Sequence, residues 1–166
     1  MSGLNTYSPS DVLVSLAGMH TVTGYADGTF IEIKKLGRPF DTQRAMDGDI
    51  SRIYHEDKGF RVKLTLMQSS STNNILSMLY NVDLATRVGK FPLIIKDGSG
   101  STTFVSLTTW IQKLPEVRFA SNLSTYTWEF GCSDAIMSIG GNDSTSAVED
   151  ALMLGTAALP LLTQYF

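Results

Sequence analysis

Few residues of this chain have the type and spacing that metal binding requires. The two histidines, His20 and His55, lie far apart, and neither belongs to a metal-binding spacing such as His-x-x-x-His. Asp41, Asp47 and Asp49 lack the alternating ligands and the closing glutamate of a calcium loop. We therefore expect these carboxylates to begin turns and to solvate a strand edge, and we expect no metal and no cofactor.

Candidate nucleophiles are equally weak. The stretch GSGS at 98–101 is typical of a hairpin tip, not of the strand-to-helix corner that exposes a catalytic serine. Gly89-Lys90 lacks the upstream glycine of a phosphate-binding loop. Cys132 alternates with aromatic residues, which predicts a buried and unreactive thiol. The sequence thus predicts a protein that is not an enzyme, although carboxylates paired only in space escape this reasoning.

The composition favours a protein that is covered by partners. Charged residues make up 17% of the 166 residues, against ~25% in typical soluble domains, and hydrophobic residues make up 43%. The net charge of −3, without a basic cluster, argues against a domain that grips nucleic-acid phosphates. One domain over residues 1–166 is expected at this length. The alternative is a compact monomer with a surface rich in Ser and Thr.

The elements that position these residues are mainly strands. In FRVKLTL (60–66) and YTWEFGC (126–132), apolar and polar residues alternate, which predicts strands with one buried and one solvated face. The more uniformly apolar FPLIIK (91–96) is typical of an inner strand. Three Asp-Gly pairs, at 27–28, 47–48 and 97–98, predict hairpin turns. We therefore expect an antiparallel β-sandwich or β-barrel.

One helix is expected at about 72–87, packed on this sheet structure. Ser71 or Thr72 can cap its start, and Ile75, Leu76, Leu79 and Val82 form its apolar stripe. A weaker helix signal begins at Ser146.

Two segments are candidate subunit interfaces. The stretch at 38–58 mixes charges with apolar residues and is either an ordinary hairpin or a projection that docks on a neighbour; its candidate contacts are Phe40, Ile50, Ile53 and Tyr54. The C-terminal arm, at about 147–166, has no charge after Asp150 and is too short and interrupted to span a membrane. Its candidate contacts are Leu152, Met153, Leu154, Leu159, Leu161 and Leu162. Either its own body or another subunit must cover this arm, and the low charge favours another subunit.

A carbohydrate-binding function is a further hypothesis. Tyr126, Trp128 and Phe130 could form a sugar platform, but their shared face with Cys132 favours a core. A monomeric β-sandwich that binds glycans through Trp110 or Trp128 is therefore a less favoured alternative.

Three stretches of the chain resemble the tail tube proteins of contractile-tailed bacteriophages. They are YSPSDVLVSLAG, VTGYADGTFIEIKK and HEDKGFRVKLTLMQSSSTNNILSMLY, and the resemblance extends from about Tyr7 to Ile139. It implies a β-barrel-like fold, which the tube protein of type VI secretion shares. A type VI secretion-like tube subunit is therefore the nearest alternative function.

The resemblance also implies a function and a set of partners. Six copies would close into a ring, and rings would stack into a hollow tube inside a sheath. The genome would leave through the polar lumen of this tube, without specific binding. The partners would be further copies of the chain and the tail sheath, baseplate and tail terminator proteins, with no membrane. The location would be the virion tail, after synthesis in the cytoplasm of the bacterial host. The excursion at 38–58 would contact a neighbouring ring or subunit.

Overall fold

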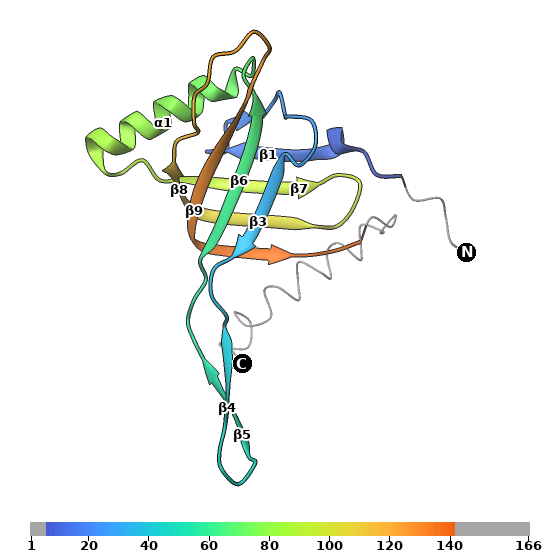
Figure 1. The fold of residues 1–166 in the computed structure, drawn as a ribbon, viewed down its shortest axis with the longest axis vertical. Coiled ribbons are helices and arrows are strands. Elements are labelled where there is room, and N and C mark those ends of the chain that lie inside the picture. The colour runs from blue at the N-terminus through green and yellow to red at the C-terminus, as the bar shows by residue number, and fades with distance from the viewer. Residues whose placement is uncertain (1–5, 142–166) are drawn as a thin grey trace. The chain divides into compact units, whose positions relative to one another are not determined.

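A computed structural model describes residues 6–141 of the chain. Over this range the fold is mainly antiparallel β with one helix, as the sequence predicted. The elements are η1 (Pro9–Asp11), β1 (Val12–Leu16), β2 (His20–Thr21), β3 (Ile31–Lys35), β4 (Phe40–Arg44), β5 (Ile50–Tyr54), β6 (Phe60–Met67), α1 (Thr72–Thr86), β7 (Phe91–Asp97), β8 (Thr103–Lys113) and β9 (Thr125–Ser138). Hydrogen bonding gives a seven-stranded sheet in the order β2-β1-β7-β8-β9-β6-β3 and a separate β4-β5 hairpin (Figure 1). The second helix and the C-terminal arm expected from the sequence lie outside the described residues.

The described chain forms two compact units, and β8 and β9 contribute residues to both. The first unit combines residues 6–22, 91–107 and 136–141, and the second combines Thr23–Lys90 and Thr108–Ala135. The burial pattern of β8 shifts by one residue where the strand passes from one unit to the other. Phe104 and Ser106 are buried before this point, and Thr109 and Ile111 are buried after it.

The first unit is built on β1 and β7, which pair antiparallel from Val12↔Asp97 to Leu16↔Leu93. Val14, Leu16 and Leu93 are at most 1% exposed and form its core. The sequence prediction of an inner strand at 91–96 is confirmed, because β7 lies between β1 and β8 in the sheet order.

The second unit is built on β3, β6 and β9. Its central pair, β6 and β9, runs in register from Phe60↔Cys132 to Met67↔Thr125. The alternation predicted for 60–66 is confirmed, since Val62, Leu64 and Leu66 are at most 1% exposed. Apolar side chains therefore point to one side of these strands, and polar side chains point to the other.

Two of the three Asp-Gly turns are confirmed as hairpins. Gly48 (φ +96°) turns β4 into β5, and the Asp49 amide donates to the Asp47 side chain. Asp97-Gly98 joins β7 to β8. The hairpin prediction for Asp27-Gly28 is wrong, because this pair lies in the irregular segment that precedes β3. An Asp-Gly pair supplies positive φ angles to any bend, and only the strands on each side make that bend a hairpin.

Helix α1 begins at Thr72 and ends at Thr86, close to the predicted bounds. Leu76 is fully buried, but Val82, at the end of the predicted stripe, is 46% exposed. The predicted cap is also different. Ser71 makes no side-chain cap, the Thr72 hydroxyl accepts from the Thr23 amide, and the Ser70 hydroxyl accepts from the Thr72 amide. The start of α1 is thus tied to residues before β3.

Replacing Ser70 by alanine should therefore lower the free energy of unfolding by ~1–2 kcal/mol. The substitution removes both the acceptor for the Thr72 amide and the donor to the Thr23 carbonyl. Urea denaturation followed by circular dichroism measures the change. Ser71→Ala is the matched control and should change stability by less than about 0.5 kcal/mol, because its side chain makes no cap. Equal effects of the two substitutions would contradict the assignment.

Candidate functional site

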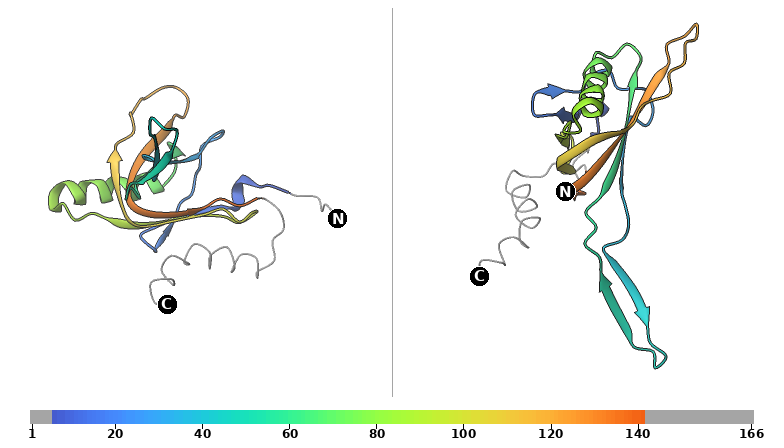
Figure 2. Two further views of the ribbon diagram at one scale, coloured as in Figure 1. Left: turned by 90° about the horizontal axis from the view of Figure 1, so that it is seen from below. Right: turned by 90° about the vertical axis from the view of Figure 1, so that its left-hand side faces the viewer.

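The β4-β5 hairpin stands out because all ten of its strand residues are exposed. It continues from β3 and β6 and extends away from them, as the ribbon views show (Figures 1 and 2). A two-stranded hairpin on its own is at best marginally stable in water. This hairpin therefore lacks the packing that normally supports a strand pair.

One face of the hairpin carries a small aromatic cluster. Phe40 pairs with Tyr54 across the strands, and their ring centroids lie 5.4 Å apart. The guanidinium carbon of Arg52 lies 4.2 Å from the centroid of Phe40, a cation–π distance. Phe40 is 43% exposed and Tyr54 59% exposed, so the cluster is organised within the hairpin but open to solvent.

The other candidate contacts widen this surface. Ile50 lies on the aromatic face, opposite Arg44, whereas Ile53 lies on the reverse face, opposite Asp41. Both isoleucines are exposed, and Met46 is fully exposed at the tip. His55 bonds Asp41 through Nε2 at 2.9 Å and fixes the base of the hairpin. The structure thus brings all four predicted residues together on one projecting element with apolar side chains on both faces.

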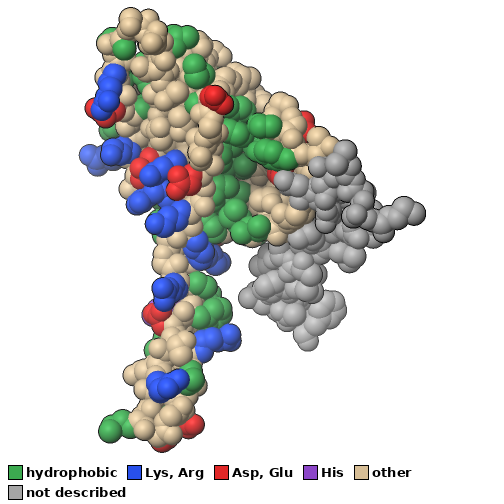
Figure 3. Space-filling model, turned by 45° about the vertical axis from the view of Figure 1, so that its right-hand side comes forward, with side chains coloured by type: hydrophobic (Ala, Val, Ile, Leu, Met, Phe, Trp, Pro, Cys, Tyr) green, Lys and Arg blue, Asp and Glu red, His purple; other side chains and the backbone are tan. Residues whose placement is uncertain are grey.

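A second surface is polar. On the solvated face of β3, β6 and β9, Lys63 lies between Glu32 and Glu129 in the strand pairing. The Arg61 Nε atom lies 2.9 Å from the Glu129 carboxylate. Acidic and basic side chains stand side by side above the hairpin in the space-filling view (Figure 3). Lys34 lies opposite Arg61 on the same face, so three basic side chains are interspersed there with two carboxylates.

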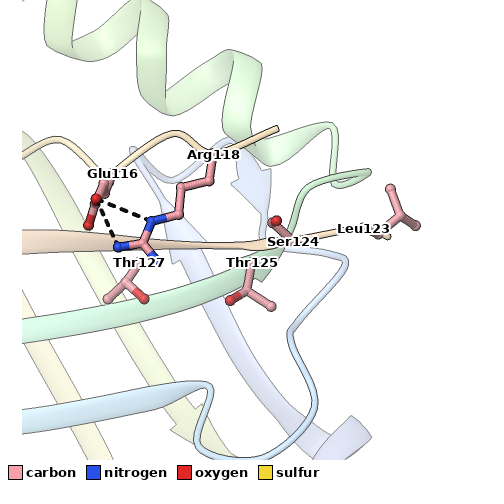
Figure 4. Close-up of a pocket in the computed structure, with 6 residues that line it drawn as sticks. All are labelled: Glu116, Arg118, Leu123, Ser124, Thr125 and Thr127. Atoms are coloured by element: carbon pink, nitrogen blue, oxygen red, sulfur yellow. Dashed lines mark hydrogen bonds and ion pairs between the residues drawn. The ribbon is translucent and has the colours of Figure 1, made fainter. Parts of the chain in front are cut away.

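A depression between the 114–124 loop and the start of β9 is also polar. It is lined by Glu116, Arg118, Leu123, Ser124, Thr125 and Thr127. Arg118 Nε and Nη2 both donate to Glu116 Oε1, at 3.2 and 2.9 Å, so the two charges satisfy each other (Figure 4). Both are strongly exposed. No pattern in the sequence had indicated this depression.

The residues that were considered as nucleophiles or metal ligands can now be placed in the structure. Cys132 is buried, as predicted, 3.4 Å from the Thr109 hydroxyl. Within residues 6–141, no group of three or more His, Cys, Asp or Glu side chains could hold a metal ion. In the same range, no helix has the length and apolar character needed to cross a membrane.

Burial rules out Trp128 as a sugar platform. Trp128 is 2% exposed, and its indole N–H donates to Asn73 Oδ1 at 2.9 Å. Trp110 lies over Gly131, where a Cβ atom would come within 2.6 Å of the indole ring. One ring is therefore part of the core, as predicted for the 126–132 strand, and the other covers a glycine backbone. The candidate contacts in the C-terminal arm, Leu152 to Leu162, lie outside the described residues.

Comparison with known proteins places this fold among those of contractile injection systems. The chain superposes on a chain of the anti-feeding prophage cap (AFP tube terminating cap) with a TM-score of 0.57 and 12% identity, covering 83% of this chain and 94% of that one. It superposes on a chain of the PVC sheath-tube complex in the extended state with a TM-score of 0.54 and 15% identity, covering 80% and 91%. At these identities the likeness shows the fold alone.

The sequence is similar to that of a bacteriophage structural protein. The chain is 27% identical over 156 residues to Structural protein ORF10 of Pseudomonas phage KPP10, which covers 89% of this chain and 90% of that protein. No protein-family model matches the chain.

Proposed function

We propose that this protein is a structural subunit of a contractile phage tail tube, made in the cytoplasm of the bacterial host and built into the virion tail. Six copies form a ring, and rings stack into a hollow tube. The observation that carries the proposal is the β4-β5 hairpin, a fully exposed element with an aromatic cluster that lacks support within its own unit. The similarity to a phage structural protein supports a structural role rather than a catalytic one.

The open sheet edge supports ring closure. Among the described strands β3 lies at the edge of the sheet and pairs with β6, so the amides and carbonyls along its other edge can pair with a neighbour. Joining such edges around a closed ring removes surfaces that would otherwise aggregate. The hairpin would then reach the next ring or subunit, with Phe40, Ile50, Ile53 and Tyr54 in contact.

The same assembly accounts for passage of the genome. A polar lumen in which carboxylates are interspersed with basic side chains would hold DNA weakly, because tight binding needs several phosphate contacts at once. The net charge of −3 adds mild repulsion. Sheath, baseplate and terminator proteins would then contact the outside and the ends of the tube, and the lumen would bind no specific sequence.

Electron microscopy of the purified chain tests the proposal. We expect six-fold rings and, at higher concentration, tubes whose length grows with protein concentration. A monodisperse monomer over the whole accessible concentration range would contradict it.

A tube-terminating subunit is the second candidate, favoured by the likeness to a tube terminating cap. A terminator forms one ring and stops, because its second face does not match its first. Rings that never elongate, but that cap preformed tubes, would favour this function over that of a tube subunit.

A further inference from the structure

One face of the sheet in the first unit is exposed and largely apolar. Four large side chains of β1, β7 and β8, here called the outer face, are 52%, 41%, 38% and 74% exposed: Leu13, Ile94, Val105 and Leu107. Their neighbours in sequence, Val14, Leu93 and Phe104, are buried. Because successive strand residues point to opposite sides, the four exposed residues share the side away from the core.

The four side chains are contiguous, and they share this side of the sheet with Ser15 and with the exposed Lys96, which lies opposite Leu13. Ser15 pairs with Ile94 and Leu13 pairs with Lys96, so Leu13 and Ile94 are diagonal neighbours. The Asp97 amide donates to the Thr102 carbonyl at 3.0 Å and closes the β7-β8 hairpin. Continuing this register places Ile94 opposite Val105. A contiguous apolar patch of this kind marks a surface that is covered in the working molecule.

The chain itself supplies a segment of matching chemistry at this point. The Thr102 hydroxyl donates to the Gly140 carbonyl at 3.1 Å, and the Ser101 amide donates to the Gly141 carbonyl at 3.2 Å. The residues after 141 therefore leave from the β7-β8 hairpin of the same unit. Residues 151–162 carry no charge, and half of them are leucine or methionine. The nine residues between can span roughly 30 Å, enough to reach any part of a face three strands wide.

We infer that residues 151–162 cover the outer face of their own subunit. A tethered segment meets its own face at an effective concentration in the millimolar range, which a separate partner does not reach at ordinary dilution. The inference does not depend on the proposed function. The sequence favoured another subunit as the surface that covers the C-terminal arm, whereas here that surface is the chain's own sheet. It leaves the hairpin as the element available for contacts between subunits.

Maleimide labelling of Leu107→Cys in the full chain tests this inference. Cys132 is 2% exposed, and the unsubstituted chain gives the background rate at which Cys132 is labelled. Adding Leu154→Asp and Leu161→Asp should raise the labelling rate at position 107 about tenfold or more, because charged side chains cannot stay buried on an apolar face. Met19→Cys, in an exposed turn of the same unit, is the control and should label at one rate in both backgrounds.

Dilution separates the two sources of protection. Protection by the subunit's own segment stays constant over a 100-fold dilution, as measured on protein shown by light scattering to be monomeric. Protection that disappears on dilution would assign the cover to another copy and overturn the inference. Equal labelling rates with and without the two aspartates would overturn it as well.

Discussion

Replacing Phe40 and Tyr54 together by serine is expected to abolish tube formation at concentrations where the unsubstituted protein assembles. The two rings contact each other, Arg52 lies over the Phe40 ring, and both rings are open to solvent. Buried aromatic anchors each contribute ~2 kcal/mol or more to an interface. Loss of two should raise the critical concentration by about 100-fold or more, as sedimentation and electron microscopy would measure.

The matched control for this substitution lies on the same strands. Gln43→Ala with Ser51→Ala alters a facing pair on the reverse side and leaves the aromatic pair intact. Assembly of this control should be close to normal, and circular dichroism should show a folded protein in both variants. If the Phe40 and Tyr54 variant assembled normally, the hairpin would not be the principal contact.

Trp128→Ala should lower the free energy of unfolding by ~3–5 kcal/mol, the largest stability change we expect from a single substitution. The indole is buried and bonds Asn73 on α1, so its removal leaves a cavity and an unpaired acceptor. Trp128→Phe keeps most of the volume and should cost ~1–3 kcal/mol through the lost hydrogen bond.

Urea denaturation measures both changes. Phe119→Ala is the control, since that aromatic ring is 86% exposed and its loss should cost less than about 0.5 kcal/mol. A small effect of Trp128→Ala would show that the ring is not part of the core and would revive the sugar-platform hypothesis.

The strands of the second unit could be predicted because each has one buried and one solvent-exposed face. Arg61 and Lys63 alternate with Val62 and Leu64, and this period of two fixes both the element and its orientation. Helix α1 was predicted within one residue because its apolar stripe has the helical period, although the residue that caps it was not the predicted one.

What could not be predicted depends on contacts between distant residues. The Ser70 hydroxyl acts as the cap because Thr23, 47 residues away, holds it in place. Ile94 looks like a core residue in FPLIIK, yet it is 41% exposed because its strand carries apolar residues on both faces. A period of two cannot show which of two apolar faces is inside.

The interface residues were named from composition, and the sequence could not decide between an ordinary and a projecting hairpin. Phe40 and Tyr54 would look the same in either case, because both have strand-like neighbours and an Asp-Gly turn between them. An ordinary and a projecting hairpin differ in what packs against these two rings. That packing depends on how the chain runs from β3 into the hairpin and back into β6.

The way the hairpin is attached also determines how it resists force. A pull on its tip is transmitted into β6, which is held to β9 by eight residue pairs in register, from Phe60 to Met67. The hydrogen bonds of an antiparallel pair run perpendicular to the strands, so a load along β6 shears all of them at once. Rupture would therefore require all of these bonds to break at once, whereas peeling would break them one at a time.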